Sequence, residues 1–116
     1  MSTATEVPEA APSSPATERR AYVRFRCYGP CTVRVIEATG GEFLGMTYNL
    51  SRSGIGFALL GQLPIGTRAL VLRVGSEHAG PLYATVVRAA QLANAWFHGC
   101  QLGCPLSEEE LQQWLR

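Results

Sequence analysis

In the stretch Thr32-Val33-Arg34-Val35-Ile36, polar and β-branched apolar side chains alternate, and the glycine pair Gly40-Gly41 follows. A period of two predicts a β-strand that directs Val33 and Val35 into a core, and adjacent glycines predict a turn. Similar segments recur along the chain, separated by residues rich in Gly and Pro. We expect strands at 32–36, 42–48, 55–60, 67–74, 82–90 and 96–102. Several short strands divided in this way predict an all-β barrel or sandwich.

A helix is predicted at the C-terminal end of the sequence. Ser107 is its expected N-cap, and Glu110 completes a capping box with it. Leu106 and Leu111 are spaced as a hydrophobic staple across the first turn. Because Leu111 and Trp114 fall on one face, we expect the helix to pack Trp114 against the barrel and close one of its ends.

The N-terminal residues differ in composition from the rest. Residues 1–17 are mostly Ser, Thr, Ala, Pro and Glu without periodicity, which predicts a disordered arm. Residues 18–116 are expected to form one domain, since 116 residues with 47% hydrophobic content suffice for a single modest core. The apolar runs are far shorter than the roughly 20 residues of a membrane span. With no signal-peptide pattern present, we expect a cytoplasmic protein without membrane insertion.

Charge is balanced overall but clustered locally. A net charge of +1 gives no reason to expect binding to nucleic acid polymers through the overall field. All ten basic residues are arginines, and four of them fall within eight positions: Arg19, Arg20, Arg24 and Arg26. A guanidinium can hold a phosphate, or the O6/N7 edge of guanine, through two hydrogen bonds. Taken alone, the cluster would be interpreted as a solvated basic edge.

A second polar pattern, Asn49-Leu50-Ser51-Arg52-Ser53-Gly54, lies about 25 residues further on. On a strand, the short side chains of Asn49 and Ser51 would project from one face. Gly54 would turn the chain or let a ligand approach bare backbone, and Arg52 is expected to face solvent. The alternative is ordinary turn chemistry, and both interpretations can hold together. Guanidinium groups beside small donors and acceptors suggest a guanine nucleotide ligand.

At these residues the sequence resembles the PilZ domain family, a bacterial receptor for cyclic di-GMP. The RxxxR motif of that family corresponds to Arg20-Ala21-Tyr22-Val23-Arg24, and its D/NxSxxG motif corresponds to the six residues from Asn49 to Gly54. The order of elements from Arg19 to Arg116, including a Gly99-x-Gln101 strand, is also similar to PilZ. The resemblance implies a six-stranded antiparallel β-barrel with a C-terminal α-helix.

The same resemblance implies a noncatalytic cyclic di-GMP receptor that carries no cofactor. Arg20 and Arg24 would bind phosphate oxygens and guanine Hoogsteen edges, while Arg19 would favour a second, stacked ligand molecule. Asn49 stands where the family more often has Asp, so affinity is expected to be lower. The predicted ligand-binding residues are Arg19, Arg20, Arg24, Asn49, Ser51 and Gly54.

The RxxxR stretch lies between the predicted arm and the first strand, where ligand binding can order a segment. We expect residues 18–24 to close over the ligand and create a surface for an unidentified downstream protein that controls motility, exopolysaccharide or adhesion. The protein itself is expected to be a monomer or weak dimer. The alternative is a PilZ-fold adaptor that does not bind nucleotide, although such adaptors usually lose the arginines that this chain retains.

The cysteines allow a third class, a small metal or redox protein. Cys27-x-x-x-Cys31 and Cys100-x-x-x-Cys104 are two pairs of the kind that bind zinc, but the second pair lies along a predicted strand. Cys27, Cys31 and Cys100 fall where a barrel places small apolar side chains, so reduced, buried thiols are expected rather than zinc or a disulfide. Catalysis is not expected, since the sequence has no aspartate and His98 is interpreted as structural.

Overall fold

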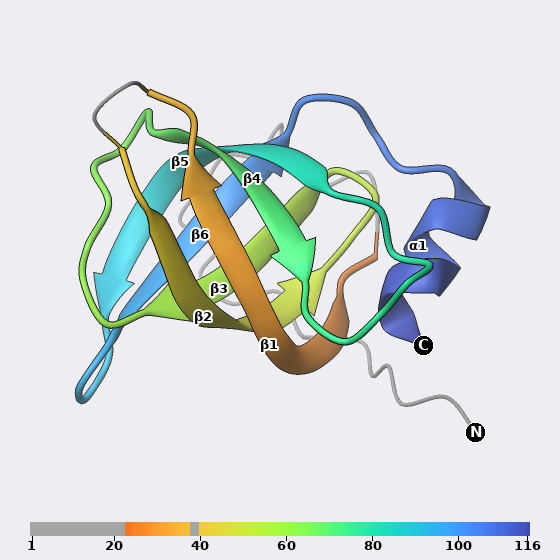
Figure 1. Ribbon diagram of the computed structural model, residues 1–116, viewed down its shortest axis with the longest axis horizontal. Helices are drawn as coiled ribbons and strands as arrows, with labels where there is room; N and C mark the ends of the chain where they lie inside the picture. The colour runs from red at the N-terminus through yellow and green to blue at the C-terminus, as the bar shows by residue number, and fades with distance from the viewer. Residues whose placement is uncertain (1–22, 38–39) are drawn as a thin grey trace.

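Seven elements follow one another in the computed structural model, which describes residues 23–37 and 40–116. They are β1 (Phe25–Val35), β2 (Glu42–Leu50), β3 (Gly54–Leu59), β4 (Arg68–Arg73), β5 (Leu82–Gln91), β6 (Trp96–Leu102) and α1 (Glu108–Leu115). The strands pair antiparallel and close into a barrel in the order β1-β2-β3-β6-β5-β4 (Figure 1). The predicted six-stranded antiparallel barrel with a C-terminal helix is confirmed. The arm predicted at 1–17 lies outside the described residues.

The first strand begins earlier than the predicted 32–36. Gly29 and Pro30 interrupt the alternation of polar and apolar residues there, so no strand was predicted over 25–31. The structure accommodates them with a β-bulge between Arg26 and Gly29 in the pairing with β2. Thr47 stabilises this bulge, because its hydroxyl donates a hydrogen bond to the Gly29 carbonyl at 3.1 Å. The early start brings the end of the RxxxR stretch directly against the barrel wall.

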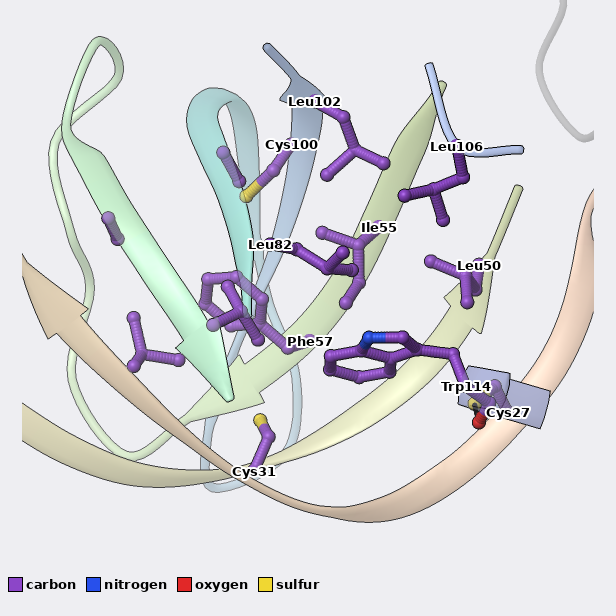
Figure 2. Packing of buried hydrophobic residues seen from close by; sticks show 14 of the residues in the cluster. Cys27, Cys31, Leu50, Ile55, Phe57, Leu82, Cys100, Leu102, Leu106 and Trp114 are labelled. Atoms are coloured by element: carbon purple, nitrogen blue, oxygen red, sulfur yellow. Dashed lines mark hydrogen bonds between the residues drawn. The ribbon is translucent and has the colours of Figure 1, made fainter. Parts of the chain in front are cut away.

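Side chains from all six strands and the C-terminal segment fill the barrel interior (Figure 2). Three of the four free thiols belong to this core, as predicted: Cys27, Cys31 and Cys100 are buried, whereas Cys104 is exposed. Burial, with a smaller contribution from neighbouring Cys27, raises the pKa of Cys31 to about 11. Burial alone raises the pKa of Cys100 to about 12. These thiols are therefore protonated at neutral pH and act as apolar packing groups.

Helix α1 packs across one end of the barrel, and Trp114 enters the core from it (Figures 1 and 2). The Trp114 side chain is 1% exposed, and its Nε1–H donates to the Gly80 carbonyl at 2.8 Å. The backbone carbonyl of Trp114 lies 3.6 Å from Cys27 Sγ, which joins the helix to β1. The predicted placement of Trp114 at the end of the barrel is confirmed.

The predicted helix start is also confirmed. Ser107 Oγ accepts from the Glu110 amide at 3.1 Å, and Glu110 Oε1 accepts from the Ser107 amide at 2.8 Å. Leu106 and Leu111, the two staple residues, are both buried. Within residues 23–37 and 40–116, no helix has the length and apolar composition that crossing a membrane requires. The capping box fixes where the chain turns from β6 onto the barrel end.

His98 is a buried structural residue of β6, as its sequence context suggested. Its ring stacks on Phe57 with centroids 5.4 Å apart, and its Nε2 accepts a hydrogen bond from the Leu63 amide at 2.9 Å. Burial lowers the pKa of His98 from 6.5, with the backbone of Phe57 and Trp96 opposing the shift. The neutral imidazole therefore anchors the loop between β3 and β4.

This anchor predicts a pH-dependent stability. Protonation would remove the acceptor at Nε2, so the folded state favours neutral His98. Because the folded pKa lies below 6.5, the stabilisation is complete above about pH 6.5 and is lost as the pH falls toward the folded value. We expect the urea midpoint to decrease as the pH falls below about 6.5. His98→Gln should abolish this dependence of the urea midpoint on pH. His78→Gln, which changes the exposed histidine, should retain it. If the midpoint varies with pH in the same way in both variants, His98 is not the cause.

Candidate ligand-binding site

Arg24, the described end of the RxxxR motif, meets the Asn49–Gly54 motif at the barrel end that also carries α1. Arg24 lies directly before β1, and Asn49 lies near the end of β2. Arg24 Nη1 donates a hydrogen bond to Asn49 Oδ1, and both residues are half-buried. Residues 25 positions apart in the sequence are thus joined side chain to side chain. This bond holds one edge of the planar Arg24 guanidinium in a defined orientation.

Ser51 forms the turn that connects β2 to β3. Its hydroxyl accepts hydrogen bonds from the amides of Ser53 and Gly54, both at 3.1 Å, and its side chain is fully buried. The Ser51 amide in turn donates to the Gly54 carbonyl at 2.9 Å. The turn-forming interpretation of Ser51 is therefore the one that the structure displays. Direct contact between Ser51 and a ligand stays a prediction.

Gly54 begins β3 and leaves space for Arg24. A Cβ at this position would lie 2.9 Å from the Cys100 carbonyl oxygen and 3.2 Å from Arg24 Nη2. In the described residues the glycines with positive φ are Gly66 and Gly75, so Gly54 is not needed for a left-handed backbone. Its missing side chain is what allows the guanidinium to approach the turn.

Arg52 does not simply face solvent, which corrects the expectation from the sequence. Its Nε donates to the Leu106 carbonyl at 2.7 Å, and its own carbonyl accepts from the Leu106 amide at 2.7 Å. The neighbouring Ser53 carbonyl accepts from the Leu102 amide at 2.9 Å. These three bonds tie the turn to the segment that leads into α1. The candidate site and the C-terminal helix are therefore parts of one connected barrel end.

A cross-strand row of residues that begins at the site was not predicted from the sequence. Consecutive cross-strand partners on β1, β2, β3, β6 and β5 form a row that we call the glycine row: Arg26, Asn49, Gly56, Gly99 and Arg88. Phe97 and Tyr48 lie next to it, with ring centroids 5.7 Å apart. No periodicity in the sequence indicates this row, because it depends on the strand order and on β-bulges at Thr47/Asn49 and Val86/Arg88.

The structure therefore brings together Arg24, Asn49 and Gly54, with Ser51 beneath them as the turn support. Arg19 and Arg20 lie outside the described residues. A guanidinium and an amide that lie side by side can bind an anion or a base edge through hydrogen bonds. Across residues 23–37 and 40–116, no three His, Cys, Asp or Glu side chains gather closely enough to hold a metal ion. The chemistry available at this end of the barrel is recognition by charge and hydrogen bonding.

Comparison with protein families gives a match to the PilZ domain over residues 18–116. The chain belongs to the PilZ domain family. The match covers the barrel, both motifs and the C-terminal helix, and so agrees with the resemblance in the arginine and Asn49–Gly54 patterns. A search of curated proteins found no match to this PilZ domain.

Solved structures with similar folds support the same architecture. One is the inhibitor of motility MotI/DgrA of Bacillus subtilis, with a TM-score of 0.59 and 21% identity over 84% of this chain and 48% of that one. Another is MrkH, described as a c-di-GMP-dependent transcription regulatory factor, with a TM-score of 0.55 and 16% identity over 82% of this chain and 48% of that one. The PilZ domain thus spans about half the length of each, and at these identities the likeness establishes the fold alone.

Proposed function

We propose that this PilZ domain is a noncatalytic receptor for cyclic di-GMP. The observation that carries the proposal is the convergence of Arg24, Asn49 and Gly54, which places a guanidinium and an amide together at the barrel rim, against a glycine that leaves room for the guanidinium. Arg24 would donate to a phosphate oxygen or to the O6/N7 edge of a guanine. Asn49 would orient Arg24 and form a hydrogen bond to the guanine base through its amide. Ser51 would hold the β2–β3 turn in the conformation that binds the ligand.

The remaining arginines of the motif complete the proposed site. Arg20 would bind the ligand together with Arg24, and Arg19 would add a further cation able to support a second, stacked ligand molecule. Both precede β1 by a few residues, so closure of residues 18–24 over the ligand would create a composite surface of chain and nucleotide. A downstream protein that controls motility, exopolysaccharide or adhesion would recognise that surface. The name of MotI as a motility inhibitor and the description of MrkH as c-di-GMP-dependent support this direction.

Calorimetric titration of the full chain with cyclic di-GMP, GMP and cyclic di-AMP tests the proposal. We expect binding of cyclic di-GMP and much weaker binding of the other two, because GMP lacks the second phosphate and base and adenine lacks the O6 acceptor. Amide hydrogen exchange of residues 18–24 should slow when the ligand is added. Failure of the intact chain to bind cyclic di-GMP would contradict the receptor function and favour the nucleotide-independent adaptor.

A further inference from the structure

Strand β5 extends past the strand that pairs with one of its edges. Strand β4 pairs with residues 82–85 of β5, and Val86 follows with two hydrogen bonds of 2.8 Å to the backbone of Gly66 and Thr67. On its other edge, β5 stays paired with β6 to its end. Among the described residues, no backbone hydrogen bond connects residues 87–91 to any segment other than β6. Beyond the point where β4 closes the barrel, β5 therefore keeps one open sheet edge.

The backbone groups on this edge point away from β6. In the turn between β5 and β6, the Leu92 amide donates to the Ala95 carbonyl at 2.8 Å. Hydrogen-bonded and non-hydrogen-bonded pairs alternate along an antiparallel ladder, and the register of β5 with β6 is unbroken from Arg88 to Gln91. Alternation from the turn therefore directs the N–H and C=O groups of Ala89 and Gln91 outward.

The open edge is exposed and weakly protected. The turn that joins β5 to β6 projects beyond the rest of the barrel (Figure 1). Val87, Arg88, Ala90 and Gln91 are exposed, and the segment contains no proline. Proteins usually protect an open edge with charged side chains, prolines or a covering loop. Arg88 is the one charged residue of the segment, and it is directed over the Phe97 ring, with the guanidinium carbon 5.8 Å from the ring centroid. The backbone edge is therefore accessible to another strand.

We propose that two copies of the chain associate through this edge, with residues 87–91 of each copy forming an antiparallel strand pair about a two-fold axis. A two-fold axis reverses the strand direction, so the same segment supplies both partners. When Ala89 lies opposite Gln91 of the second copy, the outward backbone groups of both residues are paired. Ala90 then faces its own counterpart on the axis, in a non-hydrogen-bonded pair where side chains approach most closely and a methyl group fits.

Charge and area favour a second copy as the occupant and set the strength of the association. In this register the two Arg88 residues are offset by four positions, on the order of 13 Å, which exceeds the Debye length of about 8 Å at physiological ionic strength. The two copies can therefore approach without strong repulsion. An edge of five residues is about 17 Å long and offers less than the roughly 800 Å² per partner of a standard stable interface. The dimer is therefore weak and depends on concentration.

Sedimentation velocity of the full chain without nucleotide, from about 10 μM to about 1 mM, tests the pairing over the range suited to a small interface. We expect the weight-average sedimentation coefficient of wild type to rise with concentration. Ala90→Glu and Ala90→Lys each place like charges across the axis, and each should weaken the association about 5-fold. An equimolar mixture of the two variants should restore it, because opposite charges then face each other. The controls are Val74→Glu and Val74→Lys, at an exposed residue after β4, which should associate as wild type does.

A cross-linking measurement tests the register directly. Residues of a non-hydrogen-bonded antiparallel pair have Cα atoms about 4.5 Å apart, which lies within the range of a disulfide. Ala90→Cys oxidised with diamide should therefore form a covalent dimer faster than Val74→Cys or wild type, whose exposed Cys104 serves as the background. Wild type that sediments as a monomer at every concentration, or Ala90 variants that associate and cross-link no differently from the Val74 variants, would overturn the pairing. Melting curves check the fold of each variant. Because no nucleotide is added, either result leaves the receptor function to its own titration.

Discussion

Replacing Trp114 with alanine is expected to lower the free energy of unfolding by about 3 kcal/mol. The indole is 1% exposed and closes the core at the α1 end of the barrel, so its removal leaves a large cavity. The Gly80 carbonyl also loses the donor that now lies 2.8 Å away. Domains of this kind are stable by only about 5–15 kcal/mol. Loss of one side chain therefore removes a large share of the stability of the fold.

Urea unfolding followed by circular dichroism measures this effect, and two variants serve as controls. Trp114→Phe retains an aromatic ring in the core but lacks the N–H group, so it should cost less than the alanine substitution. Trp96→Ala changes the other tryptophan, which is half-buried on β6 away from α1, and should also cost less. A Trp114→Ala midpoint equal to that of wild type would show that the helix contributes little to the barrel.

The parts of the fold that were predicted correctly are those governed by local patterns. The capping box at Ser107 and Glu110 requires only residues three apart, and the strands with regular alternation were located within a few residues. The start of β1 was missed because Gly29 and Pro30 break the alternation, and the bulge that accommodates them depends on pairing with β2. A short stretch of sequence cannot show that pairing with a neighbouring strand will accommodate its irregular residues.

In the candidate site, too, local patterns were predicted and contacts between distant residues were not. The order and spacing of the two motifs were sufficient to expect Arg24 beside Asn49, and the structure joins them. The bonds between Arg52 and Leu106 span 54 positions and arise only when the chain returns past the turn. Phe97 and Arg88 become neighbours of the site only through barrel closure and register. Motif spacing cannot predict contacts that form only when the sheet closes into a barrel.

Arg24→Ala is expected to weaken cyclic di-GMP binding by about 2–4 kcal/mol, or about 30-fold to several hundred-fold, while leaving the fold intact. Arg24 is the one arginine of the RxxxR motif within the described residues, and its guanidinium lies at the barrel rim against Asn49. Arg20→Ala is expected to act similarly. Calorimetric titration measures both, with Arg34→Ala as the matched control. Arg34 is an arginine of β1 with a 58% exposed side chain and a salt bridge to Glu42 at 3.9 Å, away from the turn, and its loss should not change the affinity.

The contact between Arg24 and Asn49 makes this prediction sharper, because the two residues should not contribute independently. If Asn49 acts by orienting the guanidinium, Asn49→Ala weakens binding less than Arg24→Ala, and adding it to Arg24→Ala costs little more. Gly54→Ala tests the same orientation from the other side, since the new methyl group would lie 3.2 Å from Arg24 Nη2 and 2.9 Å from the Cys100 carbonyl oxygen. It should lower affinity by displacing the guanidinium, and, because the Cys100 contact is to backbone, it should also lower the melting temperature by disturbing the pairing of β3 with β6. Strictly additive losses for Arg24 and Asn49 would mean that each contacts the ligand separately, and unchanged affinity in both Arg24→Ala and Arg20→Ala would eliminate the arginine motif as the binding site.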